Sequence, residues 1–146
     1  MRRFIYLALM ILLPLGFVSC NHDDDTEYYY CANSTGAVEY NSTNIGPEAE
    51  RFVVQWLDKI GIALSQCYLT RVTEADAFRR YSIGVTNLEI LQNEFNQAVE
   101  ENKNTLKNLE FSYVVSVFYA KESDPNNHIK ERSFSFKKSS FLLPVE

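Results

Sequence analysis

Carboxylates at alternate positions open the polar part of this 146-residue chain. Asp23, Asp25 and Glu27 follow one another as the first ligands of a calcium-binding loop do. Such a loop also needs a glycine at its sixth position and a bidentate glutamate at its twelfth. Tyr28 and Ser34 stand at those two positions, counted from Asp23. The pattern therefore predicts no metal site.

Residues that commonly catalyse reactions are few and scattered. The only histidines, His22 and His128, stand far apart in the chain. Neither a Gly-x-Ser-x-Gly elbow nor a glycine-rich phosphate loop occurs, so hydrolase and nucleotide chemistry have no supporting motif. The carboxylates of Glu74 and Asp76 do not converge, because residues two apart on a helix do not face each other. We predict no catalytic residue, no cofactor and no enzymatic activity.

A basic and then apolar segment begins the chain. Arg2 and Arg3 precede an apolar run from Phe4 to Val18, an arrangement typical of a secretory signal peptide. A helix that crosses a membrane needs roughly 20 apolar residues. The run is therefore too short for a membrane span and indicates export instead.

The end of this segment, Phe17-Val18-Ser19-Cys20, resembles the lipobox of bacterial lipoprotein signals. The resemblance implies cleavage after Ser19, which removes the signal peptide 1–19, and acylation of the new N-terminal Cys20, for example with palmitate. Phe17 departs from the leucine that is usual in the family. Plain secretion and an uncleaved anchor are the alternatives. On the lipoprotein interpretation, Cys20 holds the protein at a membrane.

Three aspartates, Asp23, Asp24 and Asp25, follow Cys20 closely. They resemble the export signal that Bacteroidota-type lipoproteins carry behind the lipidated cysteine, which implies an outer-membrane protein exposed at the cell surface. The alternative is a solvated acidic tether, because adjacent carboxylates repel one another and resist packing. On that alternative, the domain has periplasmic partners.

Two further cysteines, Cys31 and Cys67, remain as a pair if Cys20 carries lipid. In an oxidising compartment the two form a candidate disulfide. The loop-entropy model gives such a bridge about 4 kcal/mol of stabilisation. Two unpaired buried thiols are the alternative, because a sequence gives no distance between the sulfur atoms.

Length and charge restrict the class of protein. The chain beyond the signal peptide is long enough for one domain but not for two. We predict a lipidated acidic tether and loop over residues 20–46 and a single small α+β domain over residues 47–146. The formal net charge of −5 opposes nucleic-acid binding, which relies on basic surface to neutralise phosphates.

Hydrophobic periodicity predicts helices first and strands later. A helix begins at Pro47, a second runs from Thr73 to about Tyr81, and a third follows a break at Gly84 and a capping box at Thr86. Alternation then predicts one strand over residues 109–119 and an antiparallel partner over residues 132–136, joined by a turn. The predicted fold is α+β, with about three helices packed on a small antiparallel sheet that includes a C-terminal β-hairpin.

A third strand has three candidate locations, because a hairpin alone is marginally stable. They are Tyr28–Tyr30, Cys67–Val72 and Phe141–Val145.

Tyrosines outside any strong periodic pattern are the one feature with a functional interpretation. Tyr28, Tyr29, Tyr30 and Tyr40 offer rigid amphipathic area that suits a protein or glycan ligand; an edge strand is the alternative. We predict an outer-membrane-anchored lipoprotein that acts as a small noncovalent binding or envelope-complex module. The alternatives are a periplasm-facing structural or inhibitory lipoprotein, which an exposed strand edge would favour, and an enzyme with an unrecognised site.

Overall fold

The computed structural model describes residues 26–41 and 43–139. The predicted lipidation site Cys20, the predicted export signal Asp23, Asp24 and Asp25, and the candidate strand Phe141–Val145 lie outside the described residues.

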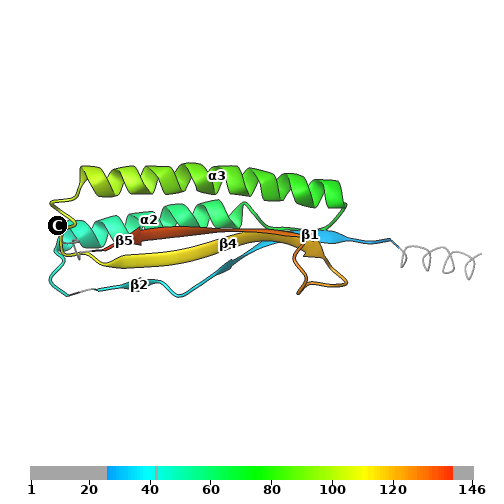
Figure 1. Ribbon diagram of the computed structural model, residues 1–146, viewed down its shortest axis with the longest axis horizontal. Coiled ribbons are helices and arrows are strands. Elements are labelled where there is room, and N and C mark those ends of the chain that lie inside the picture. Colours follow the sequence, from blue (N-terminus) through cyan, green and yellow to red (C-terminus); the bar gives the residue numbers. More distant parts are fainter. Residues whose placement is uncertain (1–25, 42, 140–146) are drawn as a thin grey trace, which may run out of the picture.

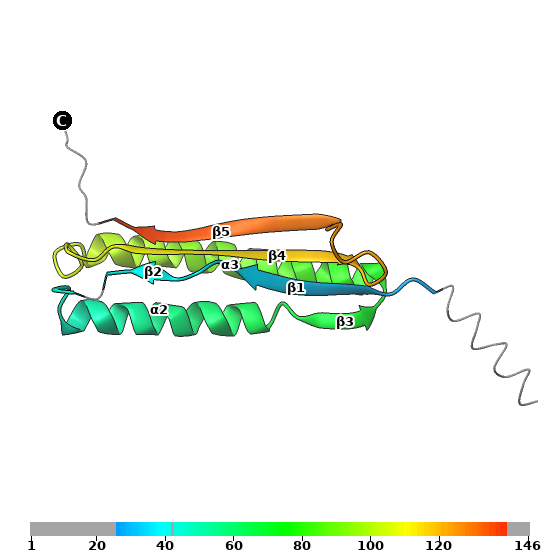
Figure 2. The same ribbon diagram turned by 90° about the horizontal axis from the view of Figure 1, so that it is seen from below.

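The domain has two layers, a five-stranded antiparallel sheet and a pair of helices on one of its faces (Figure 1). The elements in chain order are β1 Tyr29–Thr35, β2 Glu39–Tyr40, α2 Pro47–Ser65, β3 Leu69–Val72, α3 Glu74–Glu101, β4 Phe111–Lys121 and β5 Lys130–Lys138. Figure 2 shows the strands in front of α3, so that view looks onto the face of the sheet that carries no helix. The predicted α+β class and the predicted C-terminal hairpin, β4 with β5, are confirmed.

Strand β4 organises the sheet. β5 pairs with one of its edges from Phe111 to Tyr119, and β1 pairs with the other edge from Val115 to Lys121. The short strand β2 continues the line of β1 along the same edge, opposite Phe111 and Ser112. β3 pairs with the outer edge of β1. β1 and β2 fall within residues 20–46, predicted to be tether and loop, and they extend the folded domain toward the N-terminus. Two of the candidate third strands are thus present in the sheet: the one near Tyr28–Tyr30 is β1, and the one within Cys67–Val72 is β3.

The helices begin where the sequence predicts. Pro47 stands in the first turn of α2, where its missing N–H needs no partner. The N-cap residue of α3 is Thr73, whose hydroxyl accepts a hydrogen bond from the Asp76 N–H at 3.2 Å. Neither helix of the described residues is long and apolar enough to cross a membrane.

The prediction of about three helices is wrong, because α3 is one continuous helix from Glu74 to Glu101. Gly84, expected to break it, is buried in its interior. A Cβ at Gly84 would lie only 2.5 Å from the Cys67 Sγ, so the position has no space for a side chain. Thr86, expected at an N-cap, is also inside α3. Packing of the helix against the chain at Cys67 outweighs the roughly 1 kcal/mol that glycine costs within a helix.

Aromatic rings join the two layers. Phe95 on α3 is fully buried, and its ring centroid lies 5.3 Å from Trp56 on α2 and 5.8 Å from Phe111 on β4. Phe136 on β5 lies 5.6 Å away. Trp56 is therefore a core residue, as its helical phase predicts.

Candidate functional site

The sheet has one covered and one open face. Side chains alternate between the two faces of a strand. On β4, Val115 and Val117 point toward the helices and are fully buried. Val114 and Ser116 point the other way, and Val114 is 43% exposed. We call the surface that carries Val114 and Ser116 the open face.

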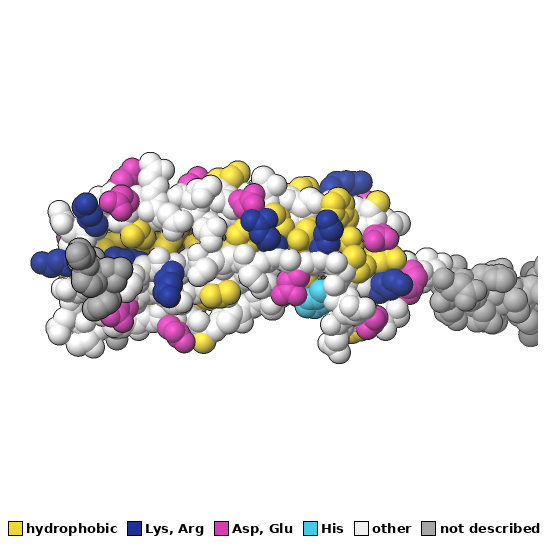
Figure 3. All heavy atoms as spheres, viewed as in Figure 1, with side chains coloured by type: hydrophobic (Ala, Val, Ile, Leu, Met, Phe, Trp, Pro, Cys, Tyr) yellow, Lys and Arg dark blue, Asp and Glu magenta, His cyan; other side chains and the backbone are white. Residues whose placement is uncertain are grey.

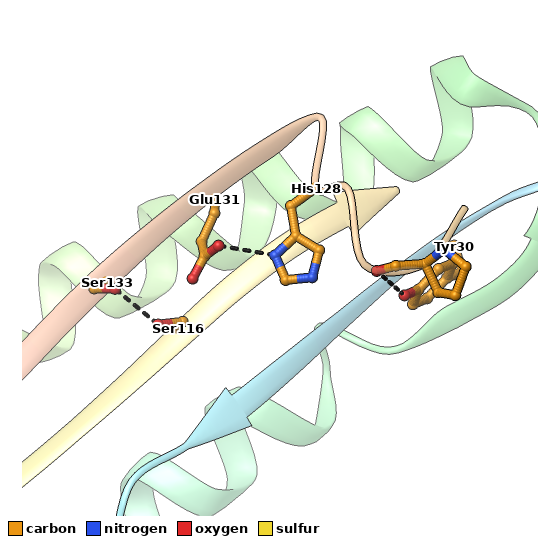
Figure 4. A network of polar contacts seen from close by, with 6 residues as sticks. Tyr30, Ser116, His128, Glu131 and Ser133 are labelled. Atoms are coloured by element: carbon orange, nitrogen blue, oxygen red, sulfur yellow. Dashed lines mark hydrogen bonds and ion pairs between the residues drawn. The ribbon is translucent and has the colours of Figure 1, made fainter. Parts of the chain in front are cut away.

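Small hydroxyl side chains occupy the middle of the open face. The strand register places Ser34 on β1 beside Ser116 on β4, and Ser116 beside Ser133 on β5. The hydroxyl oxygens of Ser116 and Ser133 are hydrogen-bonded at 2.7 Å (Figure 4). In the neighbouring rows, Ser135 on β5 lies opposite Val114, and Ser112 on β4 lies opposite Lys137. The result is a flat strip that offers hydroxyl donors and acceptors to a ligand.

An aromatic cluster closes one end of the strip. The rings of Phe118 on β4 and His128 stack with centroids 3.7 Å apart and planes 10° apart. The Nδ1 atom of His128 is hydrogen-bonded to the Glu131 carboxylate at 2.8 Å, as Figure 4 shows. Tyr30 on β1 meets the Phe118 ring edge to face at 5.9 Å. These contacts hold His128 in one orientation beside the serine strip.

The turn between β4 and β5 is held over this end. The Tyr30 hydroxyl donates a hydrogen bond to the Pro125 carbonyl oxygen at 3.2 Å. Burial raises the pKa of Tyr30, and the Glu122 carboxylate raises it further. Tyr30 therefore stays protonated and keeps its donor in the neutral pH range.

A groove of about 510 Å³ lies at the opposite end of the same strands. Its lining combines both charge signs with polar and aromatic groups, from Glu39, Tyr40, Asn41, Glu110, Phe111, Ser112, Lys137, Lys138 and Ser139. The Lys138 ammonium donates to the carbonyl oxygens of Leu109 and Ser139. Partial burial lowers the pKa of Lys138, against an opposing contribution from the Glu110 carboxylate. Lys138 thus helps to hold the groove together, and Lys137 is the exposed cation there.

The arrangement is chemically suited to binding. Among the described residues, His128 bonds to Glu131, and no hydrogen bond joins it to a hydroxyl or thiol that could serve as a nucleophile. No three metal-ligating side chains lie together in that part of the chain. What the open face offers is hydroxyl groups, ring edges and two charged ends.

The four tyrosines of the predicted binding patch do not share one surface. Tyr30 lies on the open face, whereas its neighbour Tyr29 packs against the core beneath the helices. Tyr28 lies under the Arg71 guanidinium, with 4.6 Å between that group and the ring centroid. Tyr40 lines the groove at the far end of the sheet. Of the four, Tyr30 alone lies on the open face, because Tyr40 pairs with the buried Phe111 and so belongs to the helix side of the sheet.

Cys31 and Cys67 are both fully buried and are free thiols in the structure. The Cys67 thiol contacts the Ala63 carbonyl oxygen at 3.4 Å. Burial raises the pKa of Cys31 to about 12, with a further contribution from Cys67. Their oxidation to a disulfide stays a prediction that a thiol-labelling experiment can test.

The Phe118, His128 and Glu131 cluster is the part of this surface that sequence reasoning missed. The alternation over residues 109–119 assigns even positions to solvent, and Phe118 is a large apolar residue at such a position. That exception was the available signal, because an exposed phenylalanine needs a cover. Comparisons with protein-family models, with curated proteins and with solved structures find no match for this chain.

Proposed function

We propose that this protein is a lipoprotein anchored to the outer membrane through Cys20, and that its domain binds a hydroxyl-rich ligand such as a glycan on the open face. One observation carries the second part: among residues 26–41 and 43–139 nothing forms a second layer over the face of the sheet opposite the helices, and that face presents a row of serines between two polar ends. Serine hydroxyls both donate and accept hydrogen bonds, as sugar hydroxyls do. Noncovalent binding needs no catalytic group.

The two ends of the open face support an elongated ligand. The stacked rings of Phe118 and His128 lie at one end, and aromatic groups favour the apolar faces of ligands that also carry polar edges. Glu39 and Lys137, opposite one another across Ser112, give the other end charged hydrogen-bonding groups. A polymer lying along β4 would contact both ends and the serines between them.

Binding by the open face is testable with matched variants. Val114→Arg places a long charged side chain on the open face, at a position that is 43% exposed. Ile90→Arg makes the same change at a 52% exposed position on α3. With immobilised polysaccharides as probes, we expect Val114→Arg to lose binding and Ile90→Arg to keep it. The reverse result would move the site to the helices, and no binding by the unmodified protein would reject a glycan ligand.

The anchor and its orientation form a separate part of the proposal, based on the resemblance to lipoprotein signals. Cys20→Ala should release the protein from membranes and abolish labelling by a palmitate analogue; continued acylation would reject the anchor. Protease treatment of intact cells should cleave the native domain and spare a variant with Asp23, Asp24 and Asp25 replaced by Ala. If both are spared, the acidic stretch is only a tether and the partner is periplasmic.

A second candidate, a structural lipoprotein that faces the periplasm, is favoured by one observation. Among the described residues, β5 is a nine-residue strand that pairs with β4 alone, so the backbone groups on its other edge have no strand partner, although the Ser135 carbonyl accepts a hydrogen bond from Gln92. Protection of the native domain in the protease experiment, together with a protein partner at this edge, would favour this candidate over surface binding.

A further inference from the structure

The free edge of β5 has a definite set of outward backbone groups. Gly36 donates its N–H to the Val114 carbonyl oxygen at 2.9 Å, so even-numbered residues of β4 bond toward β1. Odd-numbered residues of β4 then bond toward β5, because the groups alternate along a strand. The Ile129 N–H accordingly donates to the Tyr119 carbonyl oxygen. Since Val115 lies opposite Phe134, even-numbered residues of β5 face β4 and odd-numbered residues face outward.

A side-chain contact supports this assignment. The Gln92 amide on α3 donates a hydrogen bond to the Ser135 carbonyl oxygen at 2.8 Å. That carbonyl therefore points away from β4, as the alternation requires, and its second lone pair can still accept a hydrogen bond from another strand. The outward backbone groups belong to Glu131, Ser133, Ser135 and Lys137, whose side chains lie on the open face.

Cations often protect strand edges from association, but most of those on β5 have partners within their own chain. The Lys130 ammonium lies over the Phe78 ring at 5.4 Å, and Arg132 pairs with Glu89 at 2.8 Å. Lys138 bonds to backbone carbonyls. Figure 3 shows Lys and Arg side chains over a band of hydrophobic side chains between the level of α3 and that of the strands. Lys137 has no ion-pair partner in the described part of the chain.

We propose that the β5 edge binds a second copy of this chain, antiparallel and in the register that sets Glu131 opposite Lys137. This register pairs outward-facing residues with outward-facing residues, Glu131 with Lys137 and Ser133 with Ser135, around a two-fold axis at Phe134. It uses the whole of β5, Lys130–Lys138. Each interface then contains two cross-strand pairs of opposite charge, because the axis repeats the Glu131 and Lys137 pair.

The dimer would unite the two sheets into one. An axis perpendicular to the sheet places both open faces on the same side, next to each other. A ligand longer than one domain could then contact two serine strips, which raises the overall affinity without a new contact. The dimer does not depend on the proposed ligand, and its test needs no ligand.

Exchanging the charges of Glu131 and Lys137 tests the proposed dimer and its register. Two differently tagged copies of the full chain are expressed together, extracted in detergent and purified through one tag. We expect wild-type copies to purify together, and Glu131→Lys or Lys137→Glu in both copies to reduce this about tenfold, because both ion pairs become repulsive. One Glu131→Lys copy with one Lys137→Glu copy restores two attractive pairs, so the mixture should recover association. Lys107→Glu, a change of an exposed residue outside β5, is the matched control.

The outcomes separate the proposal from its rivals. Recovery by the mixed pair shows that each variant is folded and that the register is correct. Failure of wild-type copies to purify together would overturn the dimer, and association insensitive to both single variants would overturn the β5 register. Ser135→Pro provides a second check, because its N–H faces away from β4: it should abolish association and leave the β4–β5 pairing in place. Undiminished association of Ser135→Pro would place the interface elsewhere.

Discussion

The two faces of the same sheet differ in what covers them. On the helix side, β4 contributes Val115 and Val117, which are fully buried beneath α3. On the open side, the intervening Ser116 and Val114 have no second layer of the described structure above them. Neighbouring residues of one strand thus belong to a core and to a solvated surface. The difference indicates that the residues that stabilise the fold lie mainly on the covered face. Residues of the open face can therefore change to suit a ligand without unfolding the domain.

The largest expected effect is at the centre of the covered face. Phe95→Ala removes a fully buried α3 ring that contacts the other helix, α2, and two strands. We expect a loss of about 3 to 5 kcal/mol in the free energy of unfolding, from lost burial and the cavity that remains. Denaturant titration measures it.

The matched control changes the same residue type on the open face. Phe118 is 8% exposed, covered by His128 and Tyr30 and not by a helix. The turn that holds His128 can close over the cavity left by the Phe118 ring more easily than the packed helices can close over the cavity left by Phe95. Phe118→Ala should therefore lower the free energy of unfolding by less than Phe95→Ala. Equal losses would contradict the assignment of the core to one face.

The next effect concerns the close contact between α3 and Cys67. Gly84→Ala should destabilise the fold by about 1 to 3 kcal/mol, because the new Cβ overlaps the Cys67 sulfur. Cys67→Ala removes that sulfur, so the double variant should be more stable than the sum of the two single effects predicts. Additive free energies would show that helix bending, and not this contact, explains the cost.

Gly84 also marks a limit of sequence reasoning. The apolar faces of α2 and α3, the alternation of β4 and β5 and the Thr73 cap were predictable, because each depends on local spacing. The continuity of α3 was not, because it depends on Cys67, a residue distant in sequence. The pairing of β1 with β4 is equally non-local. For the site, the serine positions follow from alternation, but their alignment across strands requires the register.

Burial of the cysteines predicts a smaller, pH-dependent effect. The pKa of Cys31 is raised from 9.0 to about 12, so the folded state keeps the proton that the unfolded chain releases. Stability is unaffected below about pH 9 and falls as the pH rises from there toward 12. The difference in unfolding free energy between about pH 8 and about pH 10.5 should therefore be larger for the reduced wild type than for Cys31→Ala. Equal differences would contradict the burial of an ionisable thiol.

The same thiols decide the oxidation prediction. Treatment of the exported protein with a thiol reagent after denaturation, without reductant, should label neither Cys31 nor Cys67 if the bridge forms. Two labelled thiols would exclude it, and the alkaline destabilisation would then apply to the protein in its own compartment.

The smallest loss of stability is expected on the open face, where the proposed ligand binds. Ser116→Ala removes the 2.7 Å hydrogen bond to Ser133, but water can reach the hydroxyl left behind, so we expect a loss of about 1 kcal/mol or less. Ser133→Ala should cost the same, and the double variant no more than either single change, since each already removes the shared bond. Denaturant titration should thus show near-normal stability for variants that weaken binding to immobilised polysaccharide. A large stability loss would instead give Ser116 and Ser133 a structural role, because a surface free to evolve toward a ligand cannot also hold the fold together.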